Sequence, residues 1–183
     1  MLADPHHALV VIDVQQGFDD PAWGRRDNPG AEANIAALIS AWRTSGRPIV
    51  IVRHDSVSEG SPLRPGQSGN DLRPGIDGDV LITKHVNSAF YGEPDLHTWL
   101  TERGIGRLTI CGVTTNHCCE TTARMAGNLG YDVDFVIDAT HTFDRPTPEG
   151  DVIPAEEISR VTAANLQGEF ATVRTTRDVL DAD

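Results

Sequence analysis

The chain has 183 residues and a formal net charge of −12 at pH 7 with the histidines counted as neutral. This length suits a single domain over residues 1–183, large enough to bury a hydrophobic core. The negative charge argues against nucleic acid and against an anionic membrane surface as partners. No apolar run approaches the roughly 18–20 residues of a membrane-spanning helix, so we expect no membrane contact.

The chain contains three cysteines, two of which are adjacent, and such a set does not form a disulfide framework. The N-terminal residues 1–7 lack the basic region and the apolar core of a signal peptide. We therefore expect a cytoplasmic protein with reduced thiols.

Short apolar runs alternate with helical patterns along the chain, which indicates a parallel sheet covered by helices. The first run, residues 8–12, is apolar throughout, as is typical of a central strand buried on both faces. The predicted fold is a three-layer α/β/α arrangement. Its strands are predicted at residues 8–12, 48–52, 80–83, 108–110, 133–137 and 170–173.

Helices are predicted between these strands. The first is expected to begin with Asn28 as its cap and Pro29 at its first helical position, and to end near Gly46. The segment 56–79 is rich in Gly, Pro and Ser, and its length favours a functional loop over a spacer. The other helices are predicted at residues 94–103, 118–129 and 155–166, and in a short terminal segment capped by Thr175 or Thr176.

Polar or reactive groups follow each of the first four predicted strands. Asp13, His54 and Lys84 follow the first three strands, and a turn that leads to Cys118 follows the fourth. Ligands of parallel α/β sheets bind beyond the carboxyl ends of strands, where the strand order reverses. If strands one and four are neighbours there, Asp13 and Cys118 face each other across a crevice. Asp13 could then take the thiol proton while Lys84 stabilises the developing charge.

The position of Cys118 distinguishes it from the other two cysteines. It is predicted in the first turn of a helix, where unpaired N–H groups favour a thiolate and can hold an oxyanion. Cys111 and Cys119 are interpreted as buried small apolar residues. We therefore expect Cys118 to be the thiol that is alkylated first at neutral pH. His117 is adjacent to Cys118, but neighbouring helical residues point about 100° apart, which argues against a Cys–His pair.

Three separated motifs carry a resemblance to a known family, and this resemblance runs nearly end to end. They are VIDVQQGF at residues 11–18, TKHVNSAF at residues 83–90 and GVTTNHC at residues 112–118. The chain resembles the isochorismatase-like cysteine hydrolases, which include nicotinamidases and N-carbamoylsarcosine amidohydrolases. The resemblance implies a six-stranded parallel sheet in the order 3-2-1-4-5-6, no cofactor and a homo-oligomer, either a dimer or a tetramer.

The same resemblance assigns roles to individual residues. It implies a catalytic triad of Asp13, Lys84 and Cys118. It also implies a cis peptide bond between Val113 and Thr114, with the N–H groups of Thr114 and Cys118 forming an oxyanion hole.

One departure from the family concerns a metal site. Nicotinamidases carry an Asp and a His two residues apart just after the second strand, and a further His. Here that position reads Arg53-His54-Asp55, so we predict no metal. His54, His85 and His141 stay open as metal ligands, although no two of them have ligand spacing, and His54 and His85 could instead line the pocket.

Aromatic residues that follow the strand ends are candidates for the substrate pocket, and core or interface packing is an open alternative for each. The candidate substrate-binding residues are Phe18, Trp23, Phe90, Tyr91 and His117.

The predicted function is hydrolysis of a small non-peptide C–N bond, in an amide, lactam or carbamoyl-type substrate, through a thioester on Cys118. Two alternatives stay open. One is isochorismatase-type hydrolysis of a vinyl ether, and the other is a catalytically silent member of the fold. The intact set of Asp13, Lys84 and Cys118 argues against a silent protein.

Overall fold

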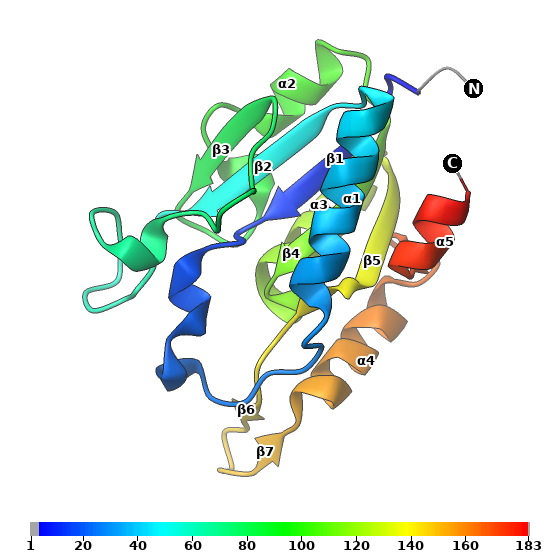
Figure 1. Ribbon diagram of the computed structural model, residues 1–183. Helices are drawn as coiled ribbons and strands as arrows, with labels where there is room; N and C mark the ends of the chain where they lie inside the picture. Colours follow the sequence, from blue (N-terminus) through cyan, green and yellow to red (C-terminus); the bar gives the residue numbers. More distant parts are fainter. Residues whose placement is uncertain (1–3, 183) are drawn as a thin grey trace.

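A parallel sheet forms the centre of the molecule, with helices on both of its faces (Figure 1). The computed structural model describes residues 4–182; residues 1–3, on which the signal-peptide expectation partly rests, and residue 183 lie outside the described part. The sheet has six strands in the order β3-β2-β1-β4-β5-β8. This confirms the predicted fold and strand order, with β8 as the sixth strand. The strands are β1 (His7–Ile12), β2 (Ile49–His54), β3 (Val80–Lys84), β4 (Arg107–Val113), β5 (Asp132–His141) and β8 (Thr172–Arg174).

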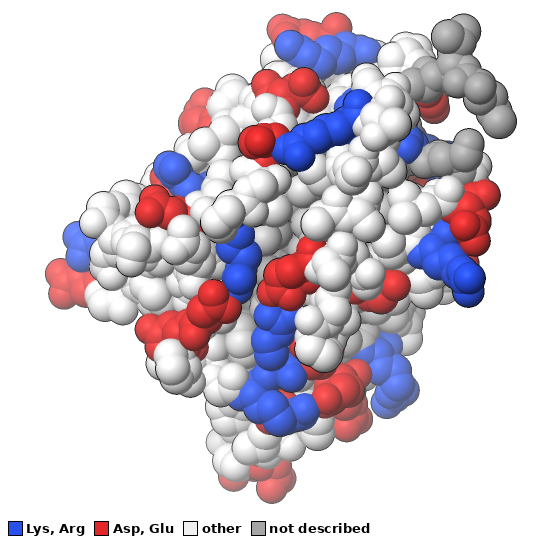
Figure 2. All heavy atoms as spheres, in the orientation of Figure 1, with Lys and Arg blue, Asp and Glu red and all other residues white. Residues whose placement is uncertain are grey.

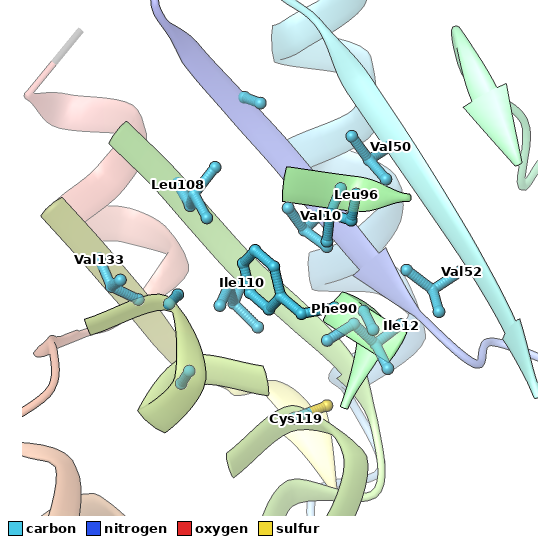
Figure 3. Packing of buried hydrophobic residues seen from close by; sticks show 14 of the residues in the cluster. Val10, Ile12, Val50, Val52, Phe90, Leu96, Leu108, Ile110, Cys119 and Val133 are labelled. Atoms are coloured by element: carbon cyan, nitrogen blue, oxygen red, sulfur yellow. The ribbon is translucent and has the colours of Figure 1, made fainter. Parts of the chain in front are cut away.

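Alternate side chains of β1 supply the two halves of the core, because successive residues of a strand point to opposite faces of a sheet. Leu9 and Val11 pack with apolar residues of α1 (Ala31–Ser45) and α5 (Thr176–Asp181). Val10 and Ile12 pack on the other face, which is drawn in Figure 3. That face is covered by α2 (Leu96–Thr101), α3 (Glu120–Asn128) and α4 (Ala155–Leu166).

The first helix begins later than the sequence predicts. α1 starts at Ala31, and Asn28 has a left-handed backbone with φ 44° instead of acting as its cap. The side-chain amide of Asn28 donates hydrogen bonds to the backbone carbonyls of Asp138 and Thr140, at 2.8 and 2.6 Å. Asn28 therefore ties the loop before α1 to β5, a long-range contact that a local capping pattern does not reveal.

The region after β4 also differs from the prediction. β5 extends to His141 instead of ending at residue 137, and its register with β4 shifts between Ile110 and Gly112. A two-stranded hairpin, β6 (Arg145–Pro146) with β7 (Val152–Ile153), lies between β5 and α4, where the sequence predicted no strand or helix. A π-helical turn, η5 (Thr115–Cys119), precedes α3. Short 3-10 helices lie at η1 (Gln16–Asp19), η2 (Pro21–Trp23), η3 (Ser68–Asn70) and η4 (Ala89–Tyr91).

Charged side chains of both signs are interspersed on the face shown in Figure 2. Many charged side chains of the protein form ion pairs, such as the pairs of Arg25 with Asp144 and with Glu156. Among the described residues, no helix has the length and apolar character that are needed to cross a membrane.

Candidate active site

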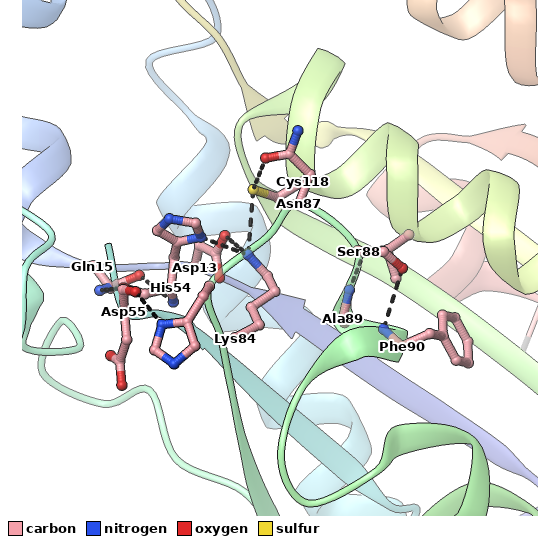
Figure 4. A network of polar contacts seen from close by, with 12 residues as sticks. Asp13, Gln15, His54, Asp55, Lys84, Asn87, Ser88, Ala89, Phe90 and Cys118 are labelled. Atoms are coloured by element: carbon pink, nitrogen blue, oxygen red, sulfur yellow. Dashed lines mark hydrogen bonds and ion pairs between the residues drawn. The ribbon is translucent and has the colours of Figure 1, made fainter. Parts of the chain in front are cut away.

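The strand ends bring the predicted catalytic side chains together (Figure 4). Asp13 follows β1, Lys84 ends β3, and Cys118 lies in the η5 turn after β4. The Lys84 Nζ donates to the Asp13 Oδ2 at 2.6 Å and to the Cys118 Sγ at 3.4 Å. Because β1 and β4 are adjacent in the sheet, the carboxylate and the thiol meet at its carboxyl edge.

The Asp13–Lys84 ion pair is buried, with relative exposures of 0 % and 1 %. Burial by itself would lower the pKa of Lys84, but the neighbouring Asp13 and Cys118 more than offset this effect and the pKa is raised. Lys84 is therefore an ammonium at neutral pH. The second carboxylate oxygen of Asp13, Oδ1, is buried and has no hydrogen-bond partner among the described residues. This oxygen is available to accept a proton.

The thiol of Cys118 is protonated in the resting protein. Burial raises its pKa, the negative charge of Asp13 raises it further, and Lys84 opposes both effects only in part. The helix-start argument, which favours a thiolate, is thus outweighed at this site. Cys118 also lies in the η5 turn and not in the first turn of α3. Attack by the sulfur therefore requires a base, and the Asp13 carboxylate lies within 4.8 Å of the Sγ.

The other two cysteines have the packing role that the sequence predicts. Cys111 and Cys119 are both fully buried, and Figure 3 shows the Cys119 side chain within the apolar cluster. Burial raises the pKa of both thiols.

The backbone beneath the thiol approaches β1 very closely. A Cβ atom at Gly112 would lie 2.0 Å from the carbonyl oxygen of Ile12, and Gly112 has φ 129°, so glycine is required there. The peptide bond between Val113 and Thr114 is cis, as the family resemblance implies.

A cavity of about 120 Å³ opens above Cys118. It is smaller than the 300–1,000 Å³ that is typical of pockets for drug-sized ligands, so it suits a small substrate. The three candidate substrate-binding residues Phe18, Trp23 and His117 line it. The complete lining is Asp13, Phe18, Trp23, His54, Leu63, Asn87, Thr114, His117, Cys118 and Arg145.

The other two candidate substrate-binding residues are not among the residues that line this cavity. Phe90 is 7 % exposed and stacks on the ring of Tyr131, and Figure 4 shows its side chain pointing away from Cys118. Tyr91 is 69 % exposed and borders a different hollow, beside His85 and Val86. Both follow β3 in sequence, but the η4 turn directs Phe90 into the core and Tyr91 outward.

Three possible metal ligands, which the sequence spacing did not predict as a group, surround the Lys84 ammonium. One ligand atom each from Asp13, His54 and Cys118 lies within 4.8 Å of the others. The Lys84 Nζ already contacts all three residues, including the His54 Nδ1 at 3.2 Å. A dication would be repelled by this ammonium, so these residues fit a lysine cation better than a metal.

The side chains of Asp55 and His85 are also held by contacts with neighbouring residues. Asp55 pairs with Arg53, at 2.8 and 3.1 Å, and accepts a hydrogen bond from Asn70. His85 Nδ1 lies 2.6 Å from the backbone carbonyl oxygen of Asp55. His141 is buried and is not among the residues that line the cavity, and burial and the nearby Arg26 lower its pKa to about 4. The expectation that no metal is bound stays a prediction.

Sequence reasoning missed three lining residues, Leu63, Asn87 and Arg145. Asn87 belongs to the second motif, three positions after Lys84, and its Oδ1 accepts a weak hydrogen bond from the Cys118 Sγ at 3.9 Å. Leu63 comes from the Gly- and Pro-rich loop that was expected to be functional. No local pattern marks Arg145, which lies in the unpredicted hairpin.

Comparison with known proteins identifies the family of this chain. A model of the isochorismatase domain matches residues 7–178. The chain belongs to the isochorismatase family. It is 37 % identical to the isochorismatase family protein YrdC of Bacillus subtilis over 95 % of this chain and 94 % of that protein. It is also 30 % identical to Nicotinamidase 3 of Arabidopsis thaliana, over 90 % of this chain and 82 % of that one.

Solved structures of the isochorismatase family share the fold along the whole chain. A family member from Chromobacterium violaceum superposes with a TM-score of 0.92 at 40 % identity, covering 98 % of this chain and 94 % of that one. A cysteine hydrolase from Pseudomonas syringae superposes with a TM-score of 0.86 at 25 % identity, covering 99 % and 94 %. The protein is thus a hydrolase of the isochorismatase family.

Proposed function

We propose that this protein hydrolyses a small non-peptide C–N bond, in an amide, lactam or carbamoyl-type substrate, through a thioester on Cys118. The observation that carries this proposal is the unpartnered Oδ1 of Asp13 beside a protonated thiol, with Lys84 in contact with both groups. The similarity to a nicotinamidase supports this bond class, and the similarity to a cysteine hydrolase supports a cysteine nucleophile.

In the first step, the Cys118 Sγ attacks the substrate carbonyl carbon while its proton moves to the Asp13 Oδ1. The new C–S bond pushes the carbonyl electron pair onto oxygen, and the N–H groups of Thr114 and Cys118 hold that oxyanion. Because the pKa of the thiol is raised, proton transfer must accompany the attack. The Lys84 ammonium balances negative charge as it moves between sulfur and carboxylate.

In the second step, the protonated Asp13 donates its proton to the leaving nitrogen, the C–N bond breaks and a thioester remains. Asp13, again a carboxylate, then takes a proton from water as the water oxygen adds to the thioester. When the C–S bond breaks, Asp13 returns that proton to the sulfur and the acid product leaves. One carboxylate can thus serve as base and acid in turn.

The competing vinyl-ether reaction makes different demands on the site. It needs an acid that protonates an enol carbon and gains nothing from a nucleophilic thiol. The Cys118 thiol, which contacts the Lys84 ammonium, would then be idle, and this favours C–N cleavage. A silent scaffold would likewise leave a buried ion pair, which is costly to desolvate, without a purpose.

Trapping the acyl-enzyme tests the proposal. The protein is incubated with a panel of small amides, lactams, ureas and esters, and ammonia or amine release is followed together with the intact mass. We expect turnover, a mass adduct that maps to Cys118, and a loss of turnover of about 10⁴-fold or more in Cys118→Ala. Cys119→Ala is the matched control, because this thiol lies in the core, and it should retain turnover. Undiminished isochorismate hydrolysis by Cys118→Ala, with no C–N substrate turned over by the parent protein, would contradict the proposal.

A further inference from the structure

An arginine without an anionic partner lines the cavity above Cys118. The Nε and Nη2 atoms of Arg145 are buried and have no hydrogen-bond partner among residues 4–182. No carboxylate of these residues forms an ion pair with it, although the chain has 27 acidic residues against 15 basic ones. Buried polar groups are almost always paired, so this exception needs a physical explanation.

The two unpartnered atoms lie on one edge of the guanidinium, and this edge binds carboxylates elsewhere in the protein. Arg25 donates through Nε and Nη2 to the two oxygens of Asp144, at 3.0 and 2.7 Å. Arg53 likewise donates through Nε and Nη2 to the two carboxylate oxygens of Asp55, at 2.8 and 3.1 Å. The parallel N–H pair of an arginine matches the two oxygens of a carboxylate. At Arg145 the same fork lacks its carboxylate.

The surroundings of Arg145 hold it in place without neutralising it. The preceding Asp144 is committed to Arg25 and to the backbone N–H of Ala155, and it anchors the base of the β6–β7 hairpin at the start of α4 (Figure 1). Burial lowers the pKa of the neighbouring His117, and the positive charge of Arg145 lowers it further, so His117 is neutral near pH 7. Glu120, which also acts on His117, is paired with Arg124.

We propose that Arg145 binds a carboxylate of the substrate, so that the substrate is a small amide, ureido or lactam acid in which one end is anionic and the other carries the scissile C–N bond. This inference rests on the proposed function for the scissile end only. Arg145 and Cys118 line the same cavity of about 120 Å³, so only a short spacer fits between the two groups. Arg145 acts here as a specificity-determining residue.

The rest of the lining agrees with a ligand of this kind. Phe18, Trp23 and Leu63 provide apolar walls, which strengthen a charge-assisted hydrogen bond by excluding water. The Arg145 guanidinium retains its charge at neutral pH although burial lowers its pKa. A positive group inside the pocket also allows an anionic substrate to bind to a protein of net charge −12.

Binding measured without turnover tests the inference. Cys118→Ala is titrated in a calorimeter with malonamate, succinamate and glutaramate, and with the neutral butanamide. We expect at least one of the three acids to bind about 10²-fold more tightly than butanamide, the value expected for a bidentate charged pair. Adding Arg145→Met should abolish this preference, and Arg145→Lys should restore only part of it, because lysine keeps the charge but lacks the fork.

Arg160→Met in the same Cys118→Ala background is the matched control, because Arg160 is a 73 % exposed arginine on the surface of α4. It should leave all affinities unchanged, and thermal melting verifies that each variant is folded. The inference is overturned if no acid binds, if butanamide binds as tightly as the acids, or if Arg145→Met keeps the preference. If the protein binds the acids but the parent protein hydrolyses no amide, the proposed reaction is contradicted and the carboxylate site at Arg145 is supported. If the parent protein hydrolyses amides without preferring acids, only the carboxylate site at Arg145 is contradicted.

Discussion

Replacing Lys84 by methionine removes a cation that contacts Asp13, His54 and Cys118. Methionine has a similar length, so the change leaves little empty space, but it leaves the Asp13 carboxylate buried and without its partner at 2.6 Å. Breaking a buried pair in this way costs about 3–5 kcal/mol. An unfolding entropy of about 2.1 cal/mol/K per residue over 183 residues gives a fall in melting temperature of roughly 10 °C.

A double-mutant cycle separates the charge from the packing. Asp13→Asn removes the orphaned charge, so the variant that carries both substitutions should be more stable than Lys84→Met alone by about 2 kcal/mol or more. Denaturant unfolding of the parent and the three variants at pH 7 measures these differences. If the double variant is no more stable than Lys84→Met, the ion-pair reasoning is refuted. All three variants should lose turnover by about 10³-fold or more, because each lacks a charge that the proposed reaction needs.

The pH dependence of the same variants provides a second test. The net effect of burial, Asp13 and Cys118 is to raise the pKa of Lys84. A raised pKa in the folded state adds stability that is fully present below the unfolded pKa of about 10.4 and is lost as the pH rises through the folded pKa. The stability difference between the parent and Lys84→Met should therefore be constant from about pH 6 to pH 9 and should decline only above about pH 10.4. A decline that begins near pH 8 would contradict the raised pKa.

Three further predictions concern the thiol, the metal and the backbone. Cys118 should be the first of the three cysteines to react with iodoacetamide, because it is the one cysteine that lines the cavity. Its labelling rate should still be rising at about pH 9, because the pKa of its thiol is raised. Peptide mapping over a pH series measures both effects, and faster labelling of another cysteine contradicts the prediction. Turnover should survive chelator treatment, since the Lys84 ammonium occupies the centre of the possible ligand group; stoichiometric zinc, manganese or iron together with chelator-sensitive activity would overturn this. Gly112→Ala should destabilise the fold by about 3 kcal/mol or more, because the new Cβ would lie 2.0 Å from a backbone oxygen. In the control Gly106→Ala the new Cβ has no atom within 4 Å, so the melting temperature should fall little. Equal melting curves for the two variants would contradict the close approach at Gly112.

Local sequence patterns predicted the elements whose burial is continuous along a strand or periodic along a helix. The apolar run at residues 8–12 corresponds to β1, and the helical pattern at residues 155–166 coincides with α4. Patterns failed where a distant contact decides the backbone. Asn28 reads as a helix cap, but two carbonyls of β5 take its side-chain amide, and α1 begins at Ala31. Such competition between a local and a long-range hydrogen bond cannot be judged from neighbouring residues alone.

The candidate site also has features that the sequence predicted and features that it did not. Asp13, Lys84 and Cys118 could be placed together from the sequence, because the carboxyl ends of parallel strands share one edge and the motifs put a reactive group at each end. The protonation state of the thiol could not be predicted from the sequence, because burial and the nearby Asp13 outweigh the local effect of the helix start.

The unpartnered edge of Arg145 depends on tertiary structure even more strongly. An arginine in an acidic chain is expected to find a carboxylate, and Arg25 and Arg53 do so. Only the tertiary structure pairs Asp144 with Arg25 and places Arg145 in the lining of a small cavity. The sequence by itself thus determined the fold and the reactive groups, because hydrophobic periodicity and strand-end chemistry are local properties. Charge pairing and solvent exclusion depend on residues far apart in the chain, so the tertiary structure decided the pKa values and the character of the pocket.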